Sequence, residues 1–176
     1  MPNSLKIPEE FIHPKILYHS SPVNDLVLVE PQKRSYRDPN EGPVIFATPD
    51  PIYATQFLVK TDGSWANGGF FDGVSYFVIS DKERFLKADK GGTIYELSPN
   101  DFYCNPEMNM GWRTWVSKVS VKPLAKHFYA SGLEAMLNKG VQVYFVERRV
   151  YKDIERSKDH GQKILRGLIS ENKKIM

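Results

Sequence analysis

Residues 44–58 read VIFATPDPIYATQFL, and this stretch does most to decide the fold. Its first four residues, 44–47, form a short apolar run, which predicts a buried strand. The run stops at a Thr-Pro-Asp-Pro sequence, where Thr48 or Asp50 can cap a helix whose first turn tolerates proline. Residues 52–58 then predict a short helix. A strand followed at once by a helix is therefore the central unit.

A second apolar run lies upstream of this unit. Residues 16–21 read ILYHSS, and a proline follows. The apolar part predicts a buried strand, and the serines and proline predict a turn at its end. Downstream, residues 61–73 contain four glycines together with Asp, Asn and Ser, which predicts a flexible loop.

The rest of the chain alternates short strands with few helices. We expect strands at 74–79, 93–97, 115–117, 119–121 and 141–146, a short turn or helix at 81–86, and helices at 131–139 and from 151 onward, with a break near Gly161. There is no regular β-α alternation, so the pattern favours a mainly antiparallel α+β fold with short flanking helices. We divide the chain into an N-terminal arm over 1–15, a domain over 16–147 and a basic helical tail over 148–176.

Composition narrows the setting. A chain of 176 residues that is 41% hydrophobic and 26% charged is typical of one globular domain. A lone cysteine, Cys104, suits a reducing compartment. We find no signal peptide and no apolar run of the roughly 20 residues that a membrane span needs. We therefore expect a cytoplasmic protein without a membrane span, although delivery by a dedicated secretion machine would leave no such trace.

Charge is concentrated at the C-terminal end. The net charge is +3, but residues 148–176 carry +5, which leaves −2 for residues 1–147. A basic tail can bind nucleic acid or an acidic partner, and it can equally be a solvated surface helix.

Several common catalytic signatures are missing from the sequence. It contains neither a glycine-rich phosphate loop nor a Gly-x-Ser-x-Gly turn, and its four histidines and one cysteine lack the spacing of metal ligands. His19 is the best candidate for chemistry, because a histidine at the end of a strand can place a ring nitrogen in a cleft. Ser20 beside it can bind a ribose or phosphate. The alternative is a histidine that bonds only a neighbouring carbonyl.

The Tyr-His-Ser-Ser run at 18–21, the Phe-Ala-Thr strand at 46–48 and the helix carrying Ala54 together resemble the ADP-ribosyltransferase superfamily. The resemblance is greatest to its histidine branch, which includes poly(ADP-ribose) polymerases and rifampicin ADP-ribosyltransferases. It covers residues 16–58 well and 93–121 loosely. It implies a split antiparallel sheet with NAD, the substrate, in a cleft.

The resemblance also implies roles for individual residues. His19 would contact the adenosine ribose, with Ser20 and Ser21 where the family has Gly and Thr. The cofactor-binding set is His19, Ser20, Ser21, Arg34, Arg37, Phe46, Thr48, Tyr53 and Phe57. In this set the arginines would contact the pyrophosphate, and the aromatic rings would stack on the ligand.

This sequence differs from the family at the position of the catalytic carboxylate. Thr114 stands at that position in the Trp112–Ser117 stretch, and a hydroxyl cannot offset the positive charge of an oxocarbenium-like transition state. Glu107, or alternatively Glu96 or Glu147, would have to substitute. The catalytic set is therefore His19, Thr114 and Glu107, with no metal.

The resemblance leads to three functional hypotheses. The first is an NAD-dependent ADP-ribosyltransferase that modifies an unidentified protein, nucleic acid or small molecule. The second is a catalytically degenerate module that binds a nucleotide or a partner on the same fold. The third is an RNA 2′-phosphotransferase, which would need more basic residues around the cleft.

Overall fold

The strand–helix unit at residues 45–55 lies at the centre of the computed structural model, which describes residues 6–32, 38–71, 73–108 and 110–170. The strand is β2 (Ile45–Ala47) and the helix is α2 (Pro51–Thr55). Asp50 is the N-cap of α2, and its side chain accepts hydrogen bonds from the backbone N–H groups of Ile52 and Tyr53. The capping prediction is confirmed for Asp50, although α2 ends three residues earlier than expected.

Three small sheets make up the strand content of the described residues. The first has the order β1-β5-β8 and is antiparallel throughout; its strands are β1 (Leu17–Ser21), β5 (Gly92–Leu97) and β8 (Ala125–Tyr129). The second has the order β2-β7-β6 and is also antiparallel, with β7 (Trp115–Ser117) and β6 (Tyr103–Cys104). A bridge between Tyr18 and Thr48 joins the first sheet to the second.

The third sheet has the order β3-β4-β9. Its strands are β3 (Ala66–Phe71), β4 (Val74–Ile79) and β9 (Gln142–Phe145). β3 and β4 form an antiparallel hairpin, whereas β4 and β9 run parallel. The fold is thus mixed α+β with mainly antiparallel pairing, as the sequence predicts.

The helices within the described residues are short. Besides α2 they are α1 (Glu9–Ile12), α3 (Lys82–Ala88), α4 (Gly132–Asn138), α5 (Arg148–Arg156) and α6 (Gln162–Ser170), with 3₁₀ turns η1 (Pro99–Asp101) and η2 (Gly111–Arg113). None of them is long and apolar enough to cross a membrane. α4 begins at the expected N-cap, Ser131, and is followed by Gly140 at φ +86°.

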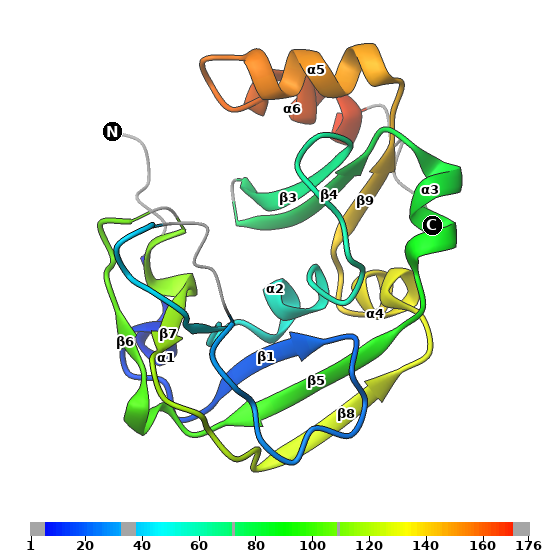
Figure 1. Cartoon of the computed structure of the whole chain (residues 1–176). Coiled ribbons are helices and arrows are strands. Elements are labelled where there is room, and N and C mark those ends of the chain that lie inside the picture. The colour runs from blue at the N-terminus through cyan, green and yellow to red at the C-terminus, as the bar shows by residue number, and fades with distance from the viewer. Residues whose placement is uncertain (1–5, 33–37, 72, 109, 171–176) are drawn as a thin grey trace.

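Figure 1 shows α2 and α4 between the β1-β5-β8 sheet and the β3-β4-β9 sheet. Buried side chains on both sides of this layer make the arrangement stable. Ala54, Leu58, Ile94 and Ala135 pack together towards the first sheet, and Met136 packs with Val143 of β9 towards the other.

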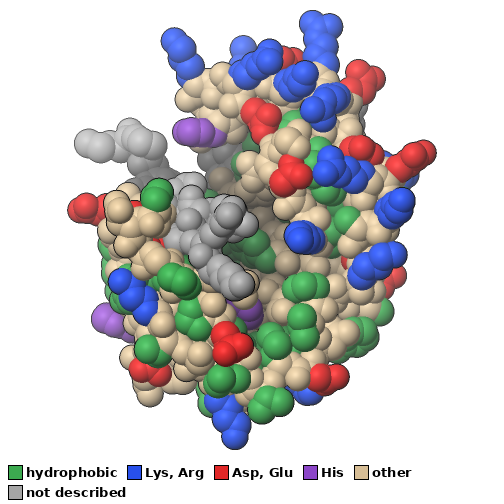
Figure 2. All heavy atoms as spheres, viewed as in Figure 1, with side chains coloured by type: hydrophobic (Ala, Val, Ile, Leu, Met, Phe, Trp, Pro, Cys, Tyr) green, Lys and Arg blue, Asp and Glu red, His purple; other side chains and the backbone are tan. Residues whose placement is uncertain are grey.

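The described part of the basic tail, residues 148–170, is packed against the third sheet. Tyr151 and Ile154 of α5 and Leu165 of α6 share a buried cluster with Val78 and Tyr144. Figure 2 shows Lys and Arg side chains gathered over α5 and α6, on the side of these helices that faces solvent. The expected break near Gly161 is present, because residues 157–161 separate the two helices and Gly161 has φ +79°.

Four local predictions are wrong. Residues 119–121, expected as a strand, form none, and Val121 makes an isolated bridge to Val29. Residues 66–71 form strand β3 where a flexible loop is expected, because they pair with β4 along their whole length. Gly68 is needed there for packing, since a Cβ would overlap the Gln56 amide and the Phe77 ring. The first strand continues through Ser21 instead of turning at Ser20, because β5 pairs with it along its whole length. The N-terminal segment, expected as an arm, contains helix α1 with Phe11 buried.

Candidate functional site

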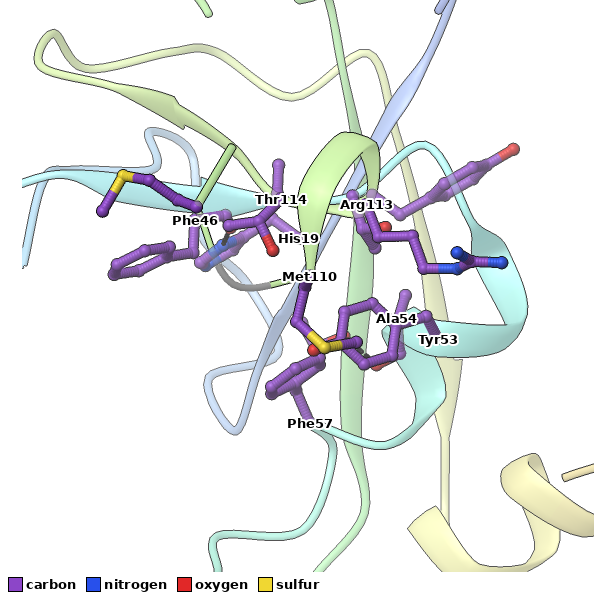
Figure 3. A pocket seen from close by; sticks show the side chains of 13 residues that line it. His19, Phe46, Tyr53, Ala54, Phe57, Met110, Arg113 and Thr114 are labelled. Carbon is purple, nitrogen blue, oxygen red and sulfur yellow. Dashed lines mark hydrogen bonds between the residues drawn. The ribbon is translucent and has the colours of Figure 1, made fainter. Parts of the chain in front are cut away.

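A cavity of about 650 Å³ opens where β1, β2, α2 and the segment before β7 meet. This volume lies within the usual range of small-molecule sites. Figure 3 shows the side chains that line it, which come from these separate elements. Aromatic and apolar side chains predominate among its lining residues, which are Tyr18, His19, Ser20, Phe46, Ala47, Thr48, Tyr53, Ala54, Phe57, Met108, Met110, Arg113 and Thr114.

His19 is held by a backbone contact to the neighbouring strand. Its Nδ1 lies 2.7 Å from the carbonyl oxygen of Phe46. Because a carbonyl only accepts, Nδ1 carries the proton in this bond, and Nε2 of the neutral ring is an acceptor. Burial lowers the pKa of His19, and the hydrogen bond to Phe46 opposes this shift only in part. The ring is therefore bonded to a carbonyl and also lines the cavity.

Three aromatic rings share the cavity with His19. Tyr53 belongs to α2, and Phe57 lies just beyond the end of this helix. Their rings meet edge to face, with centroids 4.9 Å apart. Phe46 of β2 lines the cavity beside them. Phe57 is 53% exposed, although it is a large apolar side chain. Burial raises the pKa of Tyr53 to about 12, so its phenol stays neutral. A flat ring of a ligand can stack on these faces.

Two of the three Ser and Thr residues predicted to bind the ligand line the cavity, and the third does not. Ser20 and Thr48 line the cavity. The Ser20 hydroxyl donates to the Ala54 carbonyl over 2.6 Å, and the Thr48 hydroxyl accepts from the Asp50 N–H over 3.1 Å. Each hydroxyl oxygen keeps capacity for a further bond. Ser21 is buried, accepts from the Val23 N–H and is not part of the lining.

Carboxylates are missing from the described lining of the cavity. Thr114 lines it directly after η2, at the place that the resemblance assigns to a carboxylate. Glu107 is exposed in a turn and does not line the cavity. Glu96 bonds His127 over 2.8 Å, and Glu147 is exposed ahead of α5; neither is a lining residue. Arg34 and Arg37 lie outside the described residues.

Comparisons with known proteins add no relative. No protein-family model, curated protein or solved structure matches this chain. Within the described part of the chain, no three His, Cys, Asp or Glu side chains gather as metal ligands would.

Six lining residues are absent from the predicted site sets. Three of them, Tyr18, Ala47 and Ala54, belong to the runs that carry the resemblance, and the other three come from the segment ahead of Thr114. Met108 and Met110 come from the segment before η2, and Met110 has the left-handed φ of 69°, which is uncommon for a side chain of this size. No pattern in the sequence predicts their position. Arg113 is the third, and its place directly before Thr114 was the available signal. Its guanidinium stacks 3.8 Å from the centroid of the Phe70 ring.

Proposed function

We propose that this chain is an ADP-ribosyltransferase-like protein that binds NAD in the cavity of about 650 Å³. One observation supports the proposal above all. The imidazole of His19 and the rings of Phe46, Tyr53 and Phe57 line a common hollow, although they come from two strands and a helix. A dinucleotide needs this combination of flat apolar walls and a few fixed polar groups.

The ligand contacts follow from the protonation state of the site. Nε2 of neutral His19 accepts a hydrogen bond from a ribose hydroxyl, while Nδ1 keeps its bond to the Phe46 carbonyl. The partly exposed ring of Phe57, which packs edge to face with Tyr53, stacks on a base or on the nicotinamide ring. The Ser20 hydroxyl, fixed by its donation to Ala54, accepts from a second sugar hydroxyl.

The lining favours binding over transfer. Cleavage of the nicotinamide bond builds positive charge on the ribose, and a nearby carboxylate usually stabilises it. The described lining offers Thr114 and the cation of Arg113 instead. We therefore propose the binding-module form of the family as the best account, with transfer of ADP-ribose slow or absent.

Calorimetry with NAD and an assay for released nicotinamide test this proposal. We expect the wild-type protein to bind NAD and release little nicotinamide. His19→Ala should weaken binding roughly 10-fold, the effect of one hydrogen bond together with lost ring contact. His127→Ala is the matched control, because this histidine bonds Glu96 outside the cavity, and it should bind NAD normally. Thr114→Glu should raise nicotinamide release above the wild-type level.

Two results would contradict the proposal. Rapid nicotinamide release by the wild-type protein would show a working transferase and sink the binding-module form. No NAD binding by a folded wild-type protein, as judged by circular dichroism, would sink the NAD assignment altogether.

A further inference from the structure

Arg113 is the cation in the described lining of the cavity, and two aromatic rings and a carboxylate hold it. Its guanidinium lies 3.8 Å from the centroid of Phe70 and 5.2 Å from that of Phe11. Phe70 belongs to β3 and Phe11 to α1, so two rings from elements outside the described lining fix the guanidinium. Only 29% of its side chain is exposed. A guanidinium packed in this way loses little freedom when it binds a ligand.

Asp50 holds the guanidinium by one edge only. Asp50 Oδ2 lies 3.4 Å from Nε of Arg113, whereas Oδ1 accepts the N–H groups of Ile52 and Tyr53 at the start of α2. The same buried carboxylate therefore fixes both the aromatic helix and the cation. The two Nη groups of Arg113 have no hydrogen-bond partner within the described residues, which leaves four N–H donors.

We infer that Arg113 is the anion-binding residue of the cavity and that it recognises the phosphate groups of a nucleotide. The inference rests on the proposed function, since it assigns the polar half of the same ligand. A guanidinium with two uncommitted Nη groups matches a pair of phosphate oxygens in fork geometry. Tyr53 and Phe57 line the same cavity and take the base, so the site should distinguish a nucleotide from its nucleoside.

Arg84 shows what a purely structural arginine looks like in this fold. Its guanidinium lies 4.6 Å from the Trp65 centroid and 3.4 Å from an Asp62 oxygen, so it makes the same two kinds of contact as Arg113. However, its side chain is 54% exposed and does not line the cavity. Arg84 is therefore a matched control.

The experiment compares AMP, adenosine and NAD by calorimetry with the full chain. We expect the wild-type protein to bind AMP more tightly than adenosine. Arg113→Gln should weaken AMP and NAD binding roughly 10- to 100-fold, the usual effect of losing charge-assisted hydrogen bonds, and leave adenosine binding within about twofold. The affinity of Arg113→Lys for AMP and NAD should lie between those of the wild type and Arg113→Gln. An ammonium keeps the positive charge but cannot bind two phosphate oxygens side by side as a guanidinium does. Arg84→Gln should leave all three affinities unchanged.

The remaining outcomes each support or overturn the role of Arg113 in phosphate binding. If folded Arg113→Gln binds AMP and NAD as the wild type does, the inference is overturned while the proposed function stands. If Arg113→Gln does not fold, the wild type and Arg113→Lys decide. Equal affinity of the wild type for AMP and adenosine overturns the inference, whereas a preference for AMP over adenosine that is smaller in Arg113→Lys supports it. If the wild type binds no nucleotide, the proposed function fails. Titration with inorganic pyrophosphate then tests the anion site alone: binding that Arg113→Lys weakens supports it, and no binding overturns it.

Discussion

Asp89 supports the helix behind the cavity wall, and replacing it with asparagine should destabilise the fold measurably. Oδ1 of Asp89 accepts hydrogen bonds from the N–H groups of Gly132, at 2.7 Å, and Gly91, at 3.1 Å. Oδ2 accepts from the Ser131 hydroxyl, at 2.8 Å, and the Leu133 N–H, at 3.0 Å. One half-buried carboxylate thus joins the end of α3 to the start of α4.

The size of the effect follows from these four bonds. An asparagine accepts on one side only, so in either orientation a backbone N–H faces an amide NH₂, and the charge is lost as well. One unsatisfied N–H and weaker remaining bonds cost about 2–3 kcal/mol of unfolding free energy. The cavity is affected too, because Ala135 of α4 packs against Ala54 and Leu58 next to the aromatic wall.

The pH dependence has a definite sign. Burial by itself would raise the pKa of Asp89, but the hydrogen bonds from Leu133, Gly132, Ser131 and Gly91 outweigh it and hold the pKa below its usual value of 3.8. A carboxyl group with a lowered pKa stabilises the fold fully above that value and loses the contribution as the pH falls through the folded-state pKa. The difference between wild type and Asp89→Asn should be constant near neutral pH and shrink in acid.

Urea unfolding at pH 7 and pH 3, followed by circular dichroism, measures this difference. Asp101→Asn is the control, because Asp101 is exposed at the end of η1, and it should change the unfolding free energy little. The reasoning is refuted if Asp89→Asn lies within about 0.5 kcal/mol of wild type at pH 7, where a loss of about 2–3 kcal/mol is expected. It is also refuted if the difference is as large at pH 3.

Two further outcomes follow from the structure. Because burial lowers the pKa of His19, NAD affinity should stay constant from pH 8 to about 6.5 and fall only at lower pH, once Nε2 is protonated. Calorimetry at several pH values checks this, and a loss of affinity already above about pH 6.5 would contradict it. Gly91→Ala should lower the free energy of unfolding by roughly 2–4 kcal/mol, since Gly91 has φ +67° and a Cβ would lie 2.6 Å from the Ala130 carbonyl oxygen. Urea unfolding measures this, and an unchanged midpoint would contradict the expectation.

The sequence by itself determined the elements whose signals are local. The cap at Asp50 and the helix from Ser131 to Gly140 depend on residues a few positions apart, which bond to their own neighbours. The strand at 74–79 has a local signal of another kind, a run of β-branched and aromatic residues. Those elements were predictable, and so was the mainly antiparallel α+β class that follows from their order.

Only the tertiary structure decided which polar groups meet. Strand β8 was missed because its exposed residues, which include Phe128, lack the alternation of a half-buried strand; its pairing with β5 defines it. The bond from His19 to the Phe46 carbonyl spans 27 residues, and that between Arg113 and Asp50 spans 63. Such partners are chosen by how the sheets and α2 pack around the cavity, and no local pattern in the chain encodes that packing.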